Sequence, residues 1–247
     1  MEAMQMIDLH SHILPELDDG SQSLEESLAM AQIAVESGVR AMVATPHCVH
    51  GRAREVYSGW LLLREALEDE GIPLRVYPGM EILGTAETAR LLQEGQLFTI
   101  NGSRYPLIEF LFEASAQEIT DILESVVQAG FLPLIAHPER YESVHQDPGC
   151  INTWKKMGCL FQINRGSLLG RFGSSIQDMA FSLVDRGFAT VVASDAHSYR
   201  MRTPWLQDVY QMLDKEFSPV AARYLLQRNP RSILRNEYLL PVEPAWF

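Results

Sequence analysis

The sequence alternates short apolar runs with amphipathic segments of helical period, and this alternation most constrains the fold. Seven of the runs are rich in β-branched and aromatic residues and lack a polar face. That pattern is typical of strands buried on both sides of a parallel sheet. We predict strands at 6–9, 41–44, 74–77, 107–110, 133–136, 160–163 and 190–193.

The segments between these strands carry helix signals. Ser23 and Ser115 each precede a glutamate by three residues, the capping-box pattern of a helix start, and Gly38 and Gly130 follow as stops. Further helices are predicted near 55–70, 86–94, 174–187, 204–214 and 218–228. This alternation predicts an α/β fold, here a single-domain distorted (β/α)7 barrel over residues 1–247, with 229–247 as a C-terminal tail. A doubly wound open sheet is the alternative.

Composition narrows the class of protein. A formal net charge of −12 argues against nucleic acid as a partner. Bound divalent cations would offset part of that charge, so an anionic substrate remains compatible with it. No apolar stretch approaches the roughly 18 residues of a membrane span, and the N-terminus lacks the basic start of a signal peptide. The three cysteines form no pattern, so we expect a cytoplasmic protein without stable membrane insertion.

Residues of metal-ligand type lie at or just after the ends of the predicted strands. In a barrel, these carboxyl ends meet on the face that carries the active site. Five of the seven histidines belong to the set. Any one of these side chains alone is more typical of a structural or solvated group, but their joint occurrence indicates a metal centre. The candidates are His10, His12, Asp19, His47, Glu81, Glu109, His137, Asp195 and His197.

The chemistry of this set favours hard divalent ions. Imidazole and carboxylate ligands admit manganese, iron, zinc or magnesium, and the sequence offers no thiolate cage. Neighbouring ions that share a carboxylate can activate water for attack on a phosphate ester. The sequence therefore predicts a metal-dependent phosphatase.

The motifs also resemble a known family. His10-Ser-His12, Thr45-Pro-His47, Gly79-Met-Glu81, His137-Pro-Glu-Arg140 and Ser194-Asp-Ala-His197 occur in the order and spacing of the PHP (polymerase and histidinol phosphatase) superfamily. Within it, they are most similar to the bacterial PHP-type tyrosine phosphatases of capsule and exopolysaccharide operons. The resemblance covers about residues 6–205, and it implies three metal ions, usually manganese, on a distorted barrel.

The resemblance also implies how the ligands are shared. It places His10, His12, Glu81 and Asp195 on one ion. Glu81 would bridge to a second ion held with Glu109 and His137, and Asp19, His47 and His197 would hold the third. Arg140 and Arg202 match family arginines, and a guanidinium suits phosphate oxygens, so both are candidate catalytic clamps.

One segment departs from the family pattern. After His47 the relatives usually carry another histidine and a short aromatic stretch, whereas this chain has Cys48-Val-His-Gly-Arg-Ala-Arg54. The change leaves peptide preference open. It also creates a Cys-x5-Arg match to thiol-based tyrosine phosphatases, in which Cys48 would be the nucleophile and Arg54 would bind phosphate. That mechanism would leave the remaining candidate ligands without a role.

These observations lead to one principal hypothesis. The protein is expected to be a manganese-dependent tyrosine phosphatase that uses activated water. Its expected substrate is a phosphotyrosine protein, such as a bacterial tyrosine kinase that regulates polysaccharide synthesis. A phosphatase for histidinol phosphate or another small molecule would use the same metal cluster and is the main competing hypothesis. A cysteine-based tyrosine phosphatase and a non-catalytic interaction module are weaker hypotheses.

Overall fold

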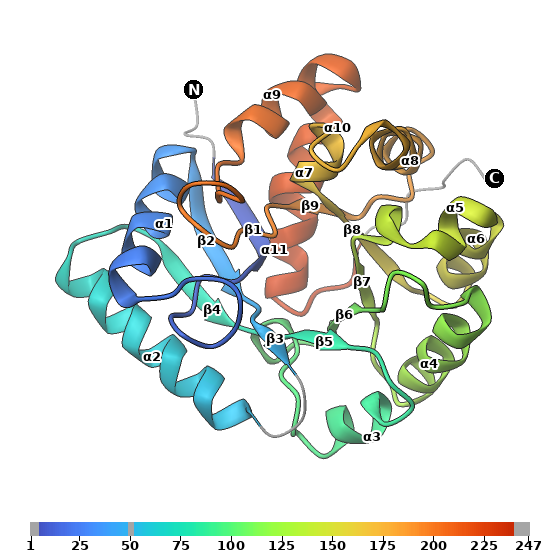
Figure 1. Cartoon of the computed structure of the whole chain (residues 1–247), viewed down its shortest axis with the longest axis horizontal. Coiled ribbons are helices and arrows are strands. Elements are labelled where there is room, and N and C mark those ends of the chain that lie inside the picture. The colour runs from blue at the N-terminus through green and yellow to red at the C-terminus, as the bar shows by residue number, and fades with distance from the viewer. Residues whose placement is uncertain (1–4, 49–51, 240–247) are drawn as a thin grey trace.

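In the part of the chain that the structure describes, nine parallel strands lie at the centre and helices lie around them (Figure 1). The computed structural model describes residues 5–48 and 52–239. The strands are β1 (Met6–Ser11), β2 (Val39–Ala44), β3 (His47–Cys48), β4 (Arg75–Pro78), β5 (Glu81–Leu83), β6 (Leu107–Glu109), β7 (Leu134–Ala136), β8 (Leu160–Asn164) and β9 (Val191–Ala193).

The strands pair into two parallel sheets. One has the order β1-β2-β4, and the other has the order β3-β5-β6-β7-β8-β9. An isolated parallel bridge between Ser11 and Ala196 connects the end of β1 to the segment after β9. Because all strands run parallel, their carboxyl ends lie on the same side, as a shared metal centre requires.

The connections are mostly helical. The α-helices are α1 (Leu24–Glu36), α2 (Ala53–Asp69), α3 (Thr88–Gln93), α4 (Ala116–Gln128), α5 (Glu142–Gln146), α6 (Gly149–Lys156), α7 (Arg165–Leu168), α8 (Ser174–Asp185), α9 (Gln207–Glu216), α10 (Pro219–Arg223) and α11 (Asn229–Leu234). Shorter turns are η1 (Ile100–Gly102), η2 (Pro138–Arg140) and the π-helical η3 (Tyr224–Arg228).

All seven predicted strands are present, with small shifts at their ends. Two strands were not predicted, β3 and β5, and each contains a candidate ligand that was expected in a loop after a strand. Thr45 and Pro46 separate β2 from β3, and Gly79 and Met80 separate β4 from β5. The chain thus passes from the first sheet to the second after each short break.

The predicted helix starts are also present. The Ser23 and Ser115 side chains accept hydrogen bonds from the backbone N–H groups of Glu26 and Glu118, which satisfies one free donor at each helix start. The helices α5, α6 and α7 were not predicted. They are short, and segments of four to eight residues show little periodicity.

The predicted C-terminal tail begins with a helix rather than an extended segment. Pro230 lies at the start of α11, where its missing N–H and fixed φ are tolerated. Ile233 and Leu234 are buried with apolar residues of β1 and β2. Residues 229–239 therefore pack against the strands, and the rest of the predicted tail, 240–247, lies outside the described residues.

Both faces of the central strands are buried. Along β2, Ala41 and Val43 belong to one apolar cluster, and Met42 and Ala44 belong to another, larger cluster. The alternation matches the two-residue period of a strand, so the two faces contact two different cores. This double burial explains the continuous apolar runs in the sequence.

Candidate metal centre

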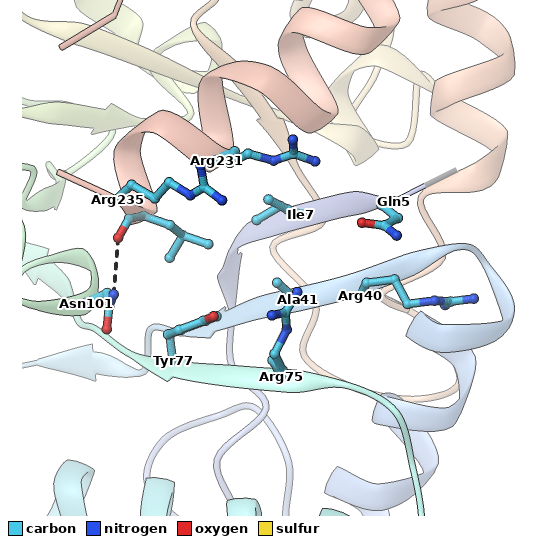
Figure 2. A pocket seen from close by; sticks show the side chains of 10 residues that line it. Gln5, Ile7, Arg40, Ala41, Arg75, Tyr77, Asn101, Arg231 and Arg235 are labelled. Atoms are coloured by element: carbon cyan, nitrogen blue, oxygen red, sulfur yellow. Dashed lines mark hydrogen bonds between the residues drawn. The ribbon is translucent and has the colours of Figure 1, made fainter. Parts of the chain in front are cut away.

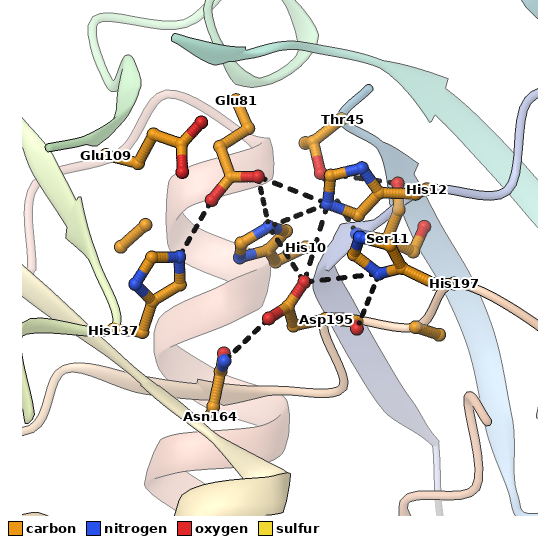
Figure 3. Close-up of polar contacts among 12 residues, drawn as sticks. His10, Ser11, His12, Thr45, Glu81, Glu109, His137, Asn164, Asp195 and His197 are labelled. Atoms are coloured by element: carbon orange, nitrogen blue, oxygen red, sulfur yellow. Dashed lines mark hydrogen bonds and ion pairs between the residues drawn. The ribbon is translucent and has the colours of Figure 1, made fainter. Parts of the chain in front are cut away.

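The nine candidate ligands lie on the carboxyl-end side of the strands, and Figure 3 shows most of them. His10 is in β1, and His12 follows that strand directly. His47 belongs to β3, Glu81 begins β5 and Glu109 ends β6. The others lie in segments that follow β1, β7 and β9, namely Asp19, His137, Asp195 and His197.

The ligand atoms of all of them except His137 form three overlapping groups, each within 4.8 Å. The groups share His12 and His47, so they form one continuous cluster rather than three separate sites. The groups are His12, Asp19, His47 and His197; His10, His12 and Asp195; and His47, Glu81 and Glu109.

Glu81 is the centre of the cluster. Its Oε2 lies 3.1 Å from Nε2 of His10, from Nε2 of His12 and from Nδ1 of His47. Its other oxygen, Oε1, lies 3.0 Å from Nε2 of His137. One buried carboxylate therefore contacts four imidazoles from three separate segments of the chain, which is the position a bridging ligand needs.

Neighbouring side chains orient the two histidines of the first strand. Nδ1 of His10 lies 2.9 Å from Gln162 Oε1, an acceptor, so Nδ1 carries a proton. Nδ1 of His12 likewise donates to Asp18 Oδ2 at 2.7 Å. Both rings therefore direct Nε2 into the cluster, and these two atoms are only 3.2 Å apart. Metal-binding histidines are held by the same kind of outer hydrogen bond.

Without metal ions, protonated histidines and ionised carboxylates of the cluster balance one another's charge. Burial alone would lower the pKa of His10, but the charges of Glu81 and Asp195 raise it to about 9. Burial would raise the pKa of Glu81, yet His10 and its neighbours hold it well below its usual range. Burial and the nearby His12 lower the pKa of His197 to about 4. Bound cations would replace those protons as the compensating charge.

Three buried atoms of the cluster test whether metal ions fit it. Oε2 of Glu81, Nδ1 of His137 and Nε2 of His197 make no hydrogen bond to any described residue. Glu81 Oε2 is close to three nitrogens but lacks hydrogen-bond geometry with them. Buried polar atoms are normally satisfied. Glu81 Oε2 lies 3.1 Å from His10 Nε2, and His197 Nε2 lies 3.4 Å from Asp19 Oδ1, so these two unsatisfied atoms lie beside other ligand atoms, as a divalent ion requires. His137 turns its other ring nitrogen, Nε2, toward Glu81.

With this geometry established, comparison with known proteins identifies the family. Residues 6–235 match the family described as "Capsular polysaccharide synthesis, CpsB/CapC". This chain belongs to the CpsB/CapC family. Among curated relatives, the tyrosine-protein phosphatase YwqE of Bacillus subtilis is 35% identical over 97% of this chain and 95% of its own length. CpsB of Streptococcus pneumoniae, also named a tyrosine-protein phosphatase, is 32% identical over 95% and 100%.

Solved structures agree with this assignment. A structure from work on YwqE and CpsB, described there as unique metal-dependent tyrosine phosphatases, has a TM-score of 0.92 and 34% identity, covering 98% of this chain and 99% of that one. A dihydropyrimidinase from Brevibacillus agri has a TM-score of 0.60 and 11% identity, covering 94% and 70%. At that identity the second likeness concerns the fold alone.

Two candidate ligands of this CpsB/CapC member have unusual backbone conformations. His137 has φ 34° and Asp195 has φ 51°, in the left-handed region that non-glycine residues rarely adopt. Such conformations cost on the order of 1–3 kcal/mol each and concentrate at functional sites. Here they turn the side chains into the cluster immediately after β7 and β9.

The two candidate arginines differ in their contacts. Arg202 forms an ion pair with Asp195 Oδ2, so its guanidinium lies beside the cluster. The Arg140 guanidinium lies between the rings of Phe112 and Phe172, at 4.4 and 4.5 Å from their centroids. Arg202 thus borders a candidate ligand directly, whereas the described contacts of Arg140 are aromatic.

Several supporting residues were not predicted as part of the site. Asp18 and Gln162 orient the histidines, and Asn164 donates to Asp195 Oδ2 at 2.6 Å. Burial raises the pKa of Asp8 to about 6, and the Ser194 hydroxyl donates to its carboxylate at 2.6 Å. Asp18 could have been found as the neighbour of Asp19. For the others, only the assembled strands reveal the contact.

The thiol mechanism does not agree with the structure. Cys48 is 4% exposed, and burial raises the pKa of its thiol, which opposes formation of a thiolate. Arg54 lies exposed on α2. Between Cys48 and Arg54, residues 49–51 lie outside the described residues. They belong to the segment 48–54 that departs from the family pattern.

Proposed function

We propose that this chain is a metal-dependent phosphatase that hydrolyses phosphotyrosine in proteins. One observation carries the proposal: the buried Glu81 carboxylate contacts four imidazoles, while outer hydrogen bonds direct Nε2 of His10 and His12 into the same cluster. The names of its relatives, which match over nearly their whole length, supply the substrate class.

The proposed centre holds three divalent ions, most simply manganese. His10, His12, Glu81 and Asp195 would hold the first ion. Glu81, Glu109 and His137 would hold the second, and Asp19, His47 and His197 the third. The observed atom groups match this division in part: they add His12 to the third set, place His47 with Glu81 and Glu109, and do not include His137. The contacts of Glu81 with His10 and His137 support the rest of the division. The two sheets, joined by the bridge from Ser11 to Ala196, support a distorted (β/α) barrel as the frame of one domain.

Divalent ions bound there would lower the pKa of water and neutralise charge on the phosphate. The residues of this chain hold and orient these ions and receive the substrate. The side chains of His47 and Asp19 are 38% and 68% exposed, whereas those of His10 and Glu81 are buried. The centre is therefore open on the side of His47 and Asp19, where a side chain of a folded protein can approach.

The arginines are proposed to bind phosphate oxygens. Arg202 lies beside Asp195 and is 36% exposed, so its guanidinium can contact a bound anion without leaving the cluster. Arg140 is held between two aromatic rings, which fixes the direction of its side chain. A phenolate leaving group, with a free-phenol pKa of ~10, needs less acid assistance than an alkoxide.

The biological setting follows from the family. We propose that the substrate is a phosphotyrosine protein of capsule or exopolysaccharide synthesis, such as a bacterial tyrosine kinase, and that the enzyme acts in the cytoplasm. In the described part of the chain, every helix is too short or too polar to cross a membrane.

Substrate class can be tested by comparing kcat/KM of the manganese-loaded protein for three phosphate monoesters. We expect a phosphotyrosine peptide to be hydrolysed faster than the matching phosphoserine peptide and than histidinol phosphate. Higher kcat/KM for histidinol phosphate would instead establish a small-molecule phosphatase. No hydrolysis of any of the three would contradict the proposed activity.

A further inference from the structure

A second pocket lies at the opposite ends of the strands from the metal centre. It has a volume of about 210 Å³ and lies between the early residues of β1, β2 and β4 and the helix α11 (Figure 2). Ile7 lines it, whereas the candidate ligand His10 lies three residues further along β1. At about 3.3 Å per residue, the two sites are roughly 10 Å or more apart.

The pocket concentrates positive charge. Four of its lining residues are arginines, Arg40, Arg75, Arg231 and Arg235, and none is acidic. This is unexpected in a chain with 32 acidic and 20 basic residues. Figure 2 shows Arg231 on α11, Arg235 directly after that helix, and the other two on the strands opposite. Three separate elements therefore bring cationic groups to one cavity.

These charges lack compensating partners among residues 5–48 and 52–239. None of the four guanidinium groups forms an ion pair with a carboxylate there. Arg40 donates to the backbone carbonyls of Val35 and Val39, at 2.8 and 2.9 Å, and these neutral acceptors leave its charge uncompensated. Like charges around one cavity repel one another. A bound anion would attract each of the guanidinium groups and so offset their mutual repulsion.

The size and surroundings of the pocket define the anion. A volume of about 210 Å³ is below the roughly 300–1,000 Å³ of typical organic-ligand sites, so the ligand is compact. Planar guanidinium groups suit phosphate oxygens, and Tyr77 and Asn101 add polar groups to the lining. None of the exposed large hydrophobic residues in the described ranges lines the pocket, so it lacks the apolar anchors of a lipid-binding surface.

We propose that this pocket binds a small soluble anion of the phosphate class, the size of inorganic phosphate or diphosphate. Arg231 and Arg235, in and directly after α11, and the arginines at the start of β2 and β4 would bind it from opposite sides. This inference rests on the pocket alone and does not depend on the proposed phosphatase activity.

Calorimetric titration of the full-length, metal-loaded chain with inorganic phosphate tests the proposal. The pocket variant is R231Q/R235Q. The control is R223Q/R228Q, which removes two charges from neighbouring positions on α10 and η3. We expect the pocket variant to lose one equivalent of bound phosphate, or to bind it at least about tenfold more weakly, while the control behaves as wild type. Unchanged stoichiometry and affinity in the pocket variant would overturn the proposal.

A second variant and a stability measurement exclude loss of folding as the cause. Arg75→Gln changes the strand side of the pocket and should weaken the same equivalent. In phosphate-free buffer of low salt, R231Q/R235Q should melt at the same or a higher temperature than wild type, because a repulsion has been removed. A lower melting temperature in that buffer, with phosphate binding intact, would show that the arginines are structural and would overturn the proposal.

Discussion

Asp18 is predicted to control metal affinity without binding metal itself. Its carboxylate accepts hydrogen bonds from Nδ1 of His12 at 2.7 Å, from the N–H of His47 at 2.8 Å and from the N–H of Gly20 at 2.9 Å. In Asp18→Asn, one of the two oxygens becomes an NH2 group, which cannot accept a hydrogen bond. Where that group replaces Oδ2, both His12 and the N–H of His47 lose their acceptor. The ring of His12 would lose its fixed orientation, and the negative charge behind it would be gone.

Two magnitudes bear on this prediction. Hydrogen bonds from His12 and its neighbours, acting against burial, lower the pKa of Asp18 to about 2 from its usual 3.8. That difference corresponds to about 2 kcal/mol in favour of the carboxylate. Changes to such outer residues typically reduce metal affinity about 10- to 100-fold, or about 1.4–2.8 kcal/mol. The first value measures how strongly the site favours a carboxylate at position 18, and the second sets the expected loss of metal affinity.

The assay is hydrolysis of para-nitrophenyl phosphate as a function of manganese concentration. For Asp18→Asn we expect the concentration for half-maximal activity to rise about 10- to 100-fold, with most activity restored at saturating manganese. Asp185→Asn, an exposed position at the end of α8, serves as the matched control. An unchanged manganese requirement in Asp18→Asn would refute the reasoning.

Three further outcomes are expected. Removing metal with a chelator should lower the melting temperature by about 5 °C or more in a thermal melt, because bound ions stabilise only the folded state, and manganese should restore it; an unchanged melt would contradict metal binding. Cys48→Ser should keep para-nitrophenyl phosphate activity within about twofold, since other residues carry out catalysis; loss of activity would reinstate the thiol mechanism. Tyr141→Phe should reduce the free energy of unfolding by about 1–3 kcal/mol in urea titrations, because its buried hydroxyl donates to Ala136 O and accepts from Phe110 N; wild-type stability would contradict that account.

Much of the fold could be predicted because both sides of the strands are buried. Continuous apolar runs then mark each strand, and the serine caps mark helix starts. The strands β3 and β5 could not be predicted in this way, because each is short and begins with a polar residue, His47 or Glu81, so no continuous apolar run marks it. The helix α11 falls within the predicted tail, although Pro230 at its start suits the first turn of a helix.

The candidate ligands could be proposed from sequence because parallel strands end on the same side. Their partners could not. Gln162 contacts His10, which is 152 residues away in the chain, and only the paired strands bring them together. The left-handed conformation of His137 and Asp195 is likewise imposed by the surrounding structure, because residues other than glycine rarely adopt it.

The central claim is that the cluster around Glu81 holds the ions that hydrolysis requires. The most direct test measures bound metal and phosphotyrosine-peptide hydrolysis together, in wild type, in Glu81→Gln and in the exposed control Glu124→Gln on α4. We predict about three ions per chain in wild type and control. We predict fewer ions in Glu81→Gln, with activity reduced more than about 100-fold, because Glu81 would be a direct ligand rather than an outer residue. Wild-type activity in Glu81→Gln, or in the chelated wild-type protein, would contradict the claim.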